Sequence, residues 1–315
     1  MKKISKVLIP GILVVFLFWM GCESTTSSDV DELESILREI VIADSTILID
    51  GIGDEGAQTA EYDYESGFAK AVLDTFPYDF RLVRFGRKLN GHPTREVEIE
   101  IDGNMAEALI TTTITGNFIV ILRDTVNHTI ADSTSKPFTQ VAKQKIRLRH
   151  FRNTSNPRHN WRVVAFSPII ARTGDKLLEI TDVSITSDSL SITLANDSED
   201  SLLNHFFDRF ELPVFRPFKL YHVELGVNNP DPFFYEPGEA AIVHYGIKRG
   251  IMKFRRVLHD DENDDSFAGD FRVGRQGCRM RRVFFDVIDL ASIFDEDAPL
   301  NSTFWAFPYR ARRRH

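Results

Sequence analysis

The sequence predicts a two-part chain, an α+β domain followed by an all-β domain, and three observations support this prediction. A single clear amphipathic helix pattern comes first, long β-branched strand patterns follow it, and short alternating strands separated by Ser/Asp turns fill the second half. The length of 315 residues agrees with two domains of about 100–200 residues each. With 43% hydrophobic and 27% charged residues, the composition is that of a globular protein.

The first domain is expected to start with a helix over residues 29–43, because its apolar residues recur at helical spacing and Asp29 with Glu32 is an N-cap signature. A second, weaker helix is expected over 64–73. In the run R-E-V-E-I-E-I at 95–101, Val97 and its apolar neighbours alternate with glutamates and should face inward. The other strands of this domain are expected at 80–85, 108–122, 140–151 and 161–170, and Gly116 predicts a bend or bulge within the second of them.

The second domain is expected to be a β-sandwich, with a boundary near residue 175. Its strand patterns are short and are spaced by roughly 8–12 residues with turn signals between them. The expected strands lie at 178–185, 189–194, 218–227, 239–247, 252–258, 267–273 and 280–288.

Two cysteines in the whole chain exclude a disulfide-stapled scaffold and a four-cysteine zinc site.

The N-terminus has the pattern of an export signal. Lys2, Lys3 and Lys6 precede an uncharged run over 7–21, which is too short for a comfortable membrane span of about 20 residues and suits a signal-peptide core. The tetrapeptide W-M-G-C that ends at Cys22 resembles the bacterial lipobox, with Trp19 departing from the aliphatic residue favoured at its first position. The resemblance implies that residues 1–21 are a lipoprotein signal peptide and that Cys22 is lipidated.

Lipidation of Cys22 would make it a membrane anchor. A thioether-linked diacylglycerol and an N-acyl chain such as palmitate hold a protein stably on a bilayer, whereas one chain binds only marginally. The polar residues 22–29 then form a flexible tether. The resemblance places the globular part in the bacterial cell envelope, outside the cytoplasm, with a net charge that changes from −8 to −11 on loss of three lysines. An uncleaved anchor and an ordinary secretory signal are the alternatives.

Two further resemblances concern the folded part. The helix at 29–43, the run A-L-I-T-T-T-I-T-G-N-F-I-V and the hairpin segment N-P-R-H-N-W-R-V-V-A-F-S-P resemble the NTF2-like (cystatin-like) family. This resemblance implies a curved antiparallel sheet with N-terminal helices over residues 30–175; another α+β roll is the alternative. The segment N-N-P-D-P-F-F-Y-E-P-G-E resembles bacterial immunoglobulin-like domains and implies such a sandwich over 176–310, followed by a basic tail at 311–315.

No strong catalytic or metal-binding motif is present. G-x-S-x-G and H-E-x-x-H do not occur, and the acidic run at 259–266 lacks the spacing of an EF-hand loop, so a solvated loop is favoured over a calcium site. No cofactor is expected. NTF2-like enzymes can use an Asp/His pair inside the cone, which makes a small-molecule enzyme the alternative function. The residues considered for such a pair are His128, His150, His159, Asp124 and Asp132.

The expected function is therefore that of a non-catalytic, membrane-anchored envelope lipoprotein that acts as a binding or interaction module. The acidic balance argues against nucleic acid as a partner. The expected partners are the lipid bilayer, through Cys22, and either an envelope protein or a small apolar ligand. Phe-rich segments at 205–210, 214–218, 231–237 and 304–309 are expected mainly to fill the sandwich core, with partner binding at an exposed edge as the alternative.

Overall fold

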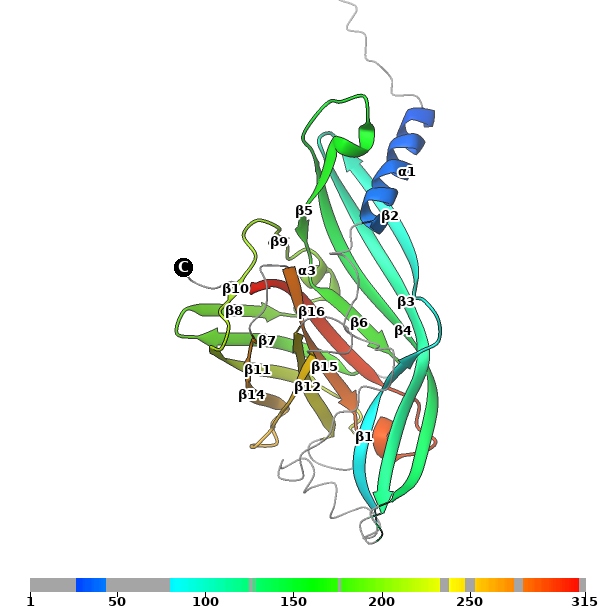
Figure 1. Ribbon diagram of the computed structural model, residues 1–315, viewed down its shortest axis with the longest axis vertical. Coiled ribbons are helices and arrows are strands. Elements are labelled where there is room, and N and C mark those ends of the chain that lie inside the picture. The colour runs from blue at the N-terminus through cyan, green and yellow to red at the C-terminus, as the bar shows by residue number, and fades with distance from the viewer. Residues whose placement is uncertain are drawn as a thin grey trace, which may run out of the picture.

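A large, mainly antiparallel sheet dominates the fold (Figure 1). The computed structural model describes residues 27–43, 80–124, 127, 129–174, 177–232, 238–246, 253–274 and 280–311. The helix expected over 29–43 is confirmed as α1 (Ser27–Ala43). The helix expected over 64–73, the domain boundary near 175 and most of the basic tail lie outside the described residues.

The first half of the chain forms long strands, as their β-branched composition predicts. Val97 on β2 is buried and the glutamates on either side of it are exposed, which confirms the expected alternation. Gly116 lies at a close approach rather than at a bulge, because an added Cβ would meet the Lys88 backbone oxygen and the Phe138 ring. The elements are β1 (Phe80–Leu89), β2 (Thr94–Asp102), β3 (Met105–Asp124), β4 (Ile130–His150), η1 (Pro157–His159), β5 (Trp161–Phe166) and β6 (Ile169–Thr173).

The strands expected in the second half are all present, within a few residues of their expected ends. Two short helices and the last strand, β16, complete this half. The elements are β7 (Glu179–Ser187), β8 (Leu190–Ala195), α3 (Glu199–Leu203), β9 (Phe207–Asp208), β10 (Val214–Phe215), β11 (Leu220–Asn228), β12 (Glu239–Gly246), β13 (Lys253–Leu258), β14 (Ser266–Arg272), β15 (Met280–Asp289), α4 (Ala291–Phe294) and β16 (Ser302–Ala311).

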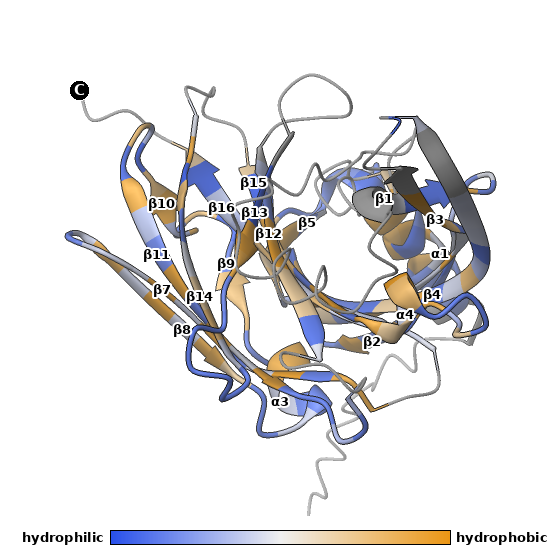
Figure 2. Ribbon diagram, turned by 90° about the horizontal axis from the view of Figure 1, so that it is seen from below, coloured by the Kyte–Doolittle hydropathy of each residue, from blue (hydrophilic) through white to orange (hydrophobic). Residues whose placement is uncertain are grey.

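The predicted fold class is wrong. The described chain is mostly β, with one large sheet that curls into a half-barrel (Figure 2), and it is not an NTF2-like α+β domain with N-terminal helices. The main order of that sheet is β1-β3-β4-β6-β16-β15-β12-β13, with β2, β5, β9 and β10 paired at its sides. The C-terminal strand β16 pairs with β6, so strands from both halves of the chain form one surface. Such non-local pairing leaves no signal in local sequence patterns.

The second sheet is smaller and packs against part of the first. It has the order β14-β11-β7-β8, and its apolar residues share a core with the outward-facing side chains of β12, β15 and β16. The β-sandwich expected for the second half is therefore not a separate unit of two sheets. One of its layers is the small sheet, and the other is a section of the half-barrel. Trp305 and Phe307 of β16 face this core, whereas Phe304 belongs to a cluster on the opposite, inner face of the curled sheet.

Three apolar clusters line the inner face of the half-barrel. At one end, Leu37 and Val41 of α1 pack against β2, β3, β4 and β5. At the other end, residues of β1, β3 and β4 meet β12, β15 and α4, for example through Phe118 and Ile293. Between them lies a third cluster that contains no helix residue. The two ends of the inner face are thus covered by described helices and strands. The residues of the middle cluster are also buried, at 4% exposure or less, but no described helix contributes to that cluster.

Candidate functional site

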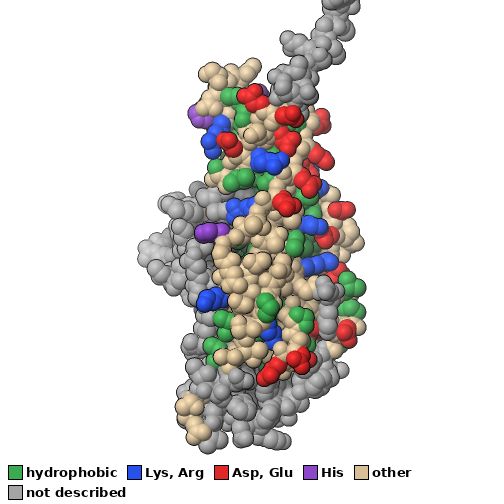
Figure 3. Space-filling model, turned by 90° about the vertical axis from the view of Figure 1, so that its right-hand side faces the viewer, with side chains coloured by type: hydrophobic (Ala, Val, Ile, Leu, Met, Phe, Trp, Pro, Cys, Tyr) green, Lys and Arg blue, Asp and Glu red, His purple; other side chains and the backbone are tan. Residues whose placement is uncertain are grey.

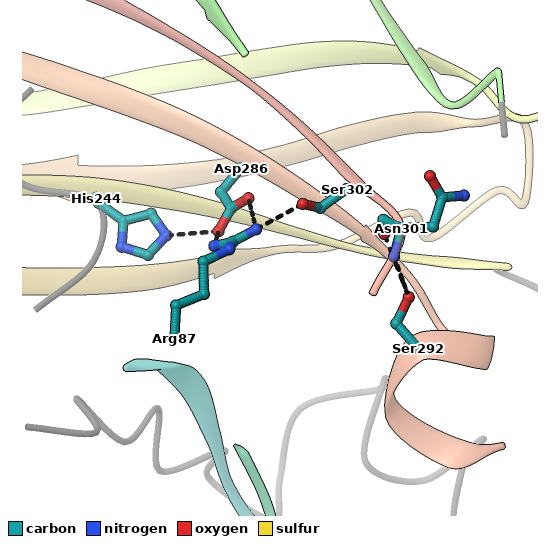
Figure 4. A network of polar contacts seen from close by, with 6 residues as sticks. All are labelled: Arg87, His244, Asp286, Ser292, Asn301 and Ser302. Atoms are coloured by element: carbon teal, nitrogen blue, oxygen red, sulfur yellow. Dashed lines mark hydrogen bonds and ion pairs between the residues drawn. The ribbon is translucent and has the colours of Figure 1, made fainter. Parts of the chain in front are cut away.

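A buried ion pair joins the two sides of the curled sheet (Figure 4). Arg87 extends from β1 to Asp286 on β15, although five strand pairings separate these strands around the sheet. Its two terminal nitrogens donate to the Asp286 carboxylate at 2.6 and 2.9 Å, and Nη2 also donates to Ser302 Oγ at 2.8 Å. Arg87 and Asp286 are 8% and 1% exposed. A bidentate pair of this kind has a defined geometry, so it fixes how β1 meets β15 and β16.

His244 of β12 is the third ionisable group of this network. Its Nε2 lies 3.5 Å from Asp286 Oδ2, too far for a well-formed hydrogen bond. Burial lowers the pKa of His244 to about 4, so the imidazole is neutral at pH 7. Burial is the largest single influence on the Asp286 carboxyl and raises its pKa, but the contacts with Arg87 and His244 together lower it by more, so the pKa lies well below its ordinary value. The cluster is therefore an Arg⁺/Asp⁻ pair beside a neutral histidine.

Ser302 does not complete a Ser-His-Asp triad. A triad needs a serine hydroxyl bonded to the histidine and the carboxylate on the other side of the ring. Here Ser302 accepts from Arg87, and Asp286 lies between Ser302 and His244 (Figure 4). The ion pair joins β1 to β15 across the half-barrel, which we call its closure, and the hydroxyl of Ser302 is not bonded to His244 as a nucleophile would be.

A second set of polar contacts fixes α4 against the same end of the sheet. Lys136 of β4 donates from Nζ to the backbone oxygens of Ser292, at 2.8 Å, and of Asp295. The backbone N–H of Asn301 donates to Ser292 Oγ at 2.8 Å, and its side-chain amide donates to Asp289 Oδ2 at 3.3 Å. These contacts hold the chain between β15 and β16 in place beside the Arg87 pair.

The middle of the inner face, which we call the central section, combines small and aromatic side chains. Three of its six apolar residues are alanines, which contribute little volume, and the rings of Phe284 and Phe304 pack edge-on with centroids 6.1 Å apart. It lies on β4, β6, β15 and β16. Its apolar residues are Ala142, Ile169, Ala171, Phe284, Phe304 and Ala306.

A row of polar residues borders the central section on the side of the ion pair. Gln140 of β4, Thr173 of β6 and Ser302 of β16 are successive register partners, so their side chains share the inner face. Gln140 is 0% exposed, yet neither polar atom of its amide has a hydrogen-bond partner among the described residues. The Thr173 hydroxyl, on a residue that is 3% exposed, also lacks one within this part of the chain. Buried amides and hydroxyls are nearly always hydrogen-bonded, so these unpaired atoms require an explanation.

Gln144, four residues further along β4, provides a contrast. It is also buried and lies on the same face, but its Nε2 donates to the backbone oxygen of Ser167 at 3.0 Å. One of two equivalent amides is therefore satisfied within the described chain, and the other is not.

Glu239, at the start of β12, is a buried carboxyl outside the ion-pair network. It accepts a hydrogen bond from the Asn229 side-chain amide. Burial raises the pKa of Glu239 to about 7, and the nearby acidic residues Asp265, Asp289 and Asp260 raise it as well. This carboxyl changes its charge near neutral pH.

The predicted lipidation site, Cys22, lies outside the described residues, as does the uncharged run that precedes it. Within the described part, no helix has both the length and the apolar character that a membrane span needs. Lipidation of Cys22 therefore stays a prediction.

Within the described residues, the two aspartates considered for the alternative function lie at the opposite end of the long strands from His150 and His159. Asp132 and His150 lie near opposite ends of the 21-residue strand β4, roughly 60 Å apart at the ordinary rise per residue. The His150 ring packs on Trp161, with centroids 5.1 Å apart, and His159 is exposed in η1. His128 lies outside the described residues, and Asp124 is at the end of β3.

The acidic loop between β13 and β14 is organised by one of its own carboxylates. Asp260 accepts hydrogen bonds from the backbone N–H groups of Asp264, at 3.2 Å, and Asp265, at 3.0 Å. Asn263 and Asp265 have positive φ angles of 53° and 61°, as tight turns require. Over the described residues, no group of three or more His, Cys, Asp or Glu side chains has the arrangement of a metal site.

The Phe-rich segments divide between core and surface. Phe215, Phe304 and Phe307 are fully buried, as expected for packing residues. Phe210 and Phe218 are each 64% exposed, and a partner at this edge stays a prediction. Another surface is acidic: Figure 3 shows carboxylates gathered over α1 and β2. The exposed acidic residues of these two elements include Asp31, Glu32, Glu39, Glu96, Glu98, Glu100 and Asp102.

Comparisons with known proteins do not assign the chain to a family. No protein-family model matches the sequence, and no curated protein matches it. One solved structure, a multidomain part of Extended-Synaptotagmin 2 that includes its SMP domain, aligns with 11% sequence identity over 78% of this chain and 64% of that one. The chain thus spans less than two thirds of that protein, and the TM-score of 0.14 is too low to indicate a shared fold.

Proposed function

We propose that this protein is a lipid-anchored lipoprotein of the bacterial cell envelope whose half-barrel binds a small apolar ligand on its inner face. In this proposal the protein is a non-catalytic binding module. Cys22 joins it to the membrane, and the described domain lies outside the cytoplasm. The N-terminal pattern supports the anchor, and the inner face of the curled sheet supports the binding role.

The central section is the observation on which the binding role rests. An apolar sheet face must be covered, and α1 covers one end of the inner face while β1 and α4 cover the other. Among the described residues, the central cluster includes no helix residue and is half alanine. A concave, mostly apolar surface bordered by a few polar groups has the character of a small-molecule site.

A fluorescent apolar probe tests the binding role. The full chain should bind N-phenyl-1-naphthylamine with a saturable rise in fluorescence. Replacement of Ala171 by Trp should abolish that rise, because the indole would occupy the central section. Ala195→Trp on exposed β8 is the control and should leave binding intact. Equal binding by both variants would place the probe elsewhere and refute the role of the inner face.

The anchor has its own test. Cells given an alkyne-tagged palmitate analogue should label the wild-type chain, and the Cys22→Ser variant should be unlabelled and released from the membrane fraction. A Cys22→Ser protein that stays membrane-bound would disprove anchoring through this residue.

A further inference from the structure

The unpartnered Gln140 amide indicates more than apolar packing in the half-barrel. An amide buried without hydrogen bonds destabilises the folded protein, because it loses its hydrogen bonds to water and gains none in return. An apolar residue at position 140 would avoid this cost, and the flanking inner-face residues of β4, Phe138 and Ala142, are apolar. The same cost applies to the Thr173 hydroxyl, which belongs to the direct register partner of Gln140.

From this row we infer that Gln140 and Thr173 form a subsite for an uncharged polar group of an amphipathic ligand, such as an ester, an amide or an alcohol. This inference rests on the proposed function, since the apolar part of the same ligand packs on the central section. Gln140 offers two donors and an acceptor, and Thr173 offers a donor and acceptors. The pair can therefore bind a group that accepts, donates or does both.

The charges around the subsite favour an uncharged group over a carboxylate. Arg87, the cation that reaches Ser302 at the end of the polar row, already has its charge balanced by Asp286. Lys136 donates to two backbone oxygens and lies near Asp295, Glu296 and Asp297. A ligand carboxylate bound at Gln140 would meet only neutral donors, because Arg87 and Lys136 are already paired. Burial of an ion without a counter-charge is costly.

The apolar part of the ligand has a defined direction from the subsite. Ala142 and Ala171 lie two residues from Gln140 and Thr173 on the same strands, so they occupy the next positions on the same face. They are register partners of each other, and Phe304 is the register partner of Ala171 on β16. A chain bound by its polar group at Gln140 thus passes directly onto the alanine and phenylalanine surface.

The test compares three ligands and two glutamine variants. Native mass spectrometry of the detergent-solubilised full chain measures binding of 1-monooleoylglycerol, oleate and 1-octadecene, which share a long chain and differ in the polar group. Gln140→Leu removes the proposed subsite. Gln144→Leu is the matched control, because Gln144 is also a buried amide on the same face of β4 and already has a protein partner. Partition into micelles is common to all variants and cancels in their ratios.

The expected result is that Gln140→Leu weakens binding of 1-monooleoylglycerol about tenfold, the worth of one or two hydrogen bonds, and leaves 1-octadecene binding unchanged. Thermal unfolding of the ligand-free protein gives an independent readout: Gln140→Leu should raise the melting temperature, and Gln144→Leu should lower it because Ser167 loses its donor.

Each other outcome has a definite meaning. If the wild type binds all three ligands and Gln140→Leu changes none of them, the subsite is refuted while the proposed binding function stands, and Gln140 serves an internal water instead. If oleate binds more tightly than 1-monooleoylglycerol, the preference for an uncharged group is wrong. If the wild type binds none of the three, the proposed binding function fails together with the inference.

Discussion

The ion pair between Arg87 and Asp286 allows a quantitative test of how the half-barrel is closed. The pair joins β1 to β15 and is almost completely buried. Replacement of Asp286 by Asn leaves the Arg87 guanidinium buried without a counter-charge. Replacement of Arg87 by Met leaves the Asp286 carboxylate with only the neutral His244 ring at 3.5 Å. Loss of one partner of a buried pair costs about 3–5 kcal/mol, so each single variant should lose that amount.

The double variant Arg87→Met/Asp286→Leu should be more stable than either single variant. Removal of both charges leaves no buried ion, and apolar residues of similar volume can replace a buried pair at little cost. The remaining loss is the hydrogen bond from Arg87 to Ser302, worth about 1 kcal/mol. For a protein of this size a loss of 1 kcal/mol lowers the melting temperature by roughly 2–4 °C, so the single variants should melt about 10 °C lower.

Urea unfolding followed by tryptophan fluorescence measures these changes, since Trp161 and Trp305 are buried in the described fold. The exposed pair between Lys143 and Glu199 is the control, with a distance of 2.8 Å and half-exposed side chains. Lys143→Met should cost less than about 1 kcal/mol. If Asp286→Asn lowers the free energy of unfolding as little as this control does, the pair does not close the half-barrel. The same conclusion follows if the double variant loses the sum of the free energies lost by the two single variants.

The remaining predictions concern pH, close packing and the acidic loop. His244 has its pKa lowered to about 4, so it removes about 3 kcal/mol of stability as the pH falls from 6.5 to 4. Glu239, with a pKa raised to about 7, removes a similar amount as the pH rises from 4.5 to 7. Urea unfolding from pH 4.5 to 7.5 should therefore show opposite slopes in His244→Gln and Glu239→Gln, and parallel profiles would contradict both shifts. Gly116→Ala should cost about 1–3 kcal/mol, measured by the same unfolding assay, because its Cβ meets backbone; an unchanged midpoint would show that β1 can shift. Asp260→Ala should lower stability by about 1–2 kcal/mol through the two backbone N–H groups it leaves unpaired, while Asp261→Ala, at an exposed position of the same loop, should not.

The sequence predicted individual strands well and their arrangement poorly. Strands such as β2 and β11 alternate between buried and exposed residues, and this period of two is visible locally. β16 was not expected as a strand, because both of its faces are buried and its residues S-T-F-W-A-F-P-Y-R-A do not alternate. Pro308 also argues against a central strand. β6 and β10 pair with the same side of β16, and Pro308 lies between Ala306, the last residue paired with β6, and Arg310, the first residue paired with β10. Neither of these two strands pairs with Pro308, so its missing N–H is tolerated on this side.

The sheet order was missed for a physical reason. Thr173 and Ser302 are register partners although 129 residues separate them, and nothing in either local sequence identifies the other. The prediction of an NTF2-like domain paired the strands of the first half with one another. The structure instead continues the sheet through β6 into β16, and this continuation makes one half-barrel from both halves of the chain.

The buried polar residues leave a faint local signal in the sequence. Asp286 interrupts the apolar run V-F-F-D-V-I, and His244 follows A-A-I-V, so both are polar residues in strands with two buried faces. A charged residue at such a position needs a partner. That the partner is Arg87, 199 residues away, requires the tertiary structure. Gln140 had no comparable signal, because it lies in the mixed sequence K-P-F-T-Q-V-A-K-Q-K.

The closure of the sheet and the proposed ligand site depend on the same strands. Ser302 accepts a hydrogen bond from Arg87 and is also the register partner of Thr173, so the polar row of the subsite begins where the ion pair ends. Closure at this point brings β1 and α4 over one end of the inner face, and α1 covers the other. In the proposed function the ligand therefore meets the sheet in the central section, where the alanines lie beside the buried glutamine of β4 whose amide has no partner in the described chain.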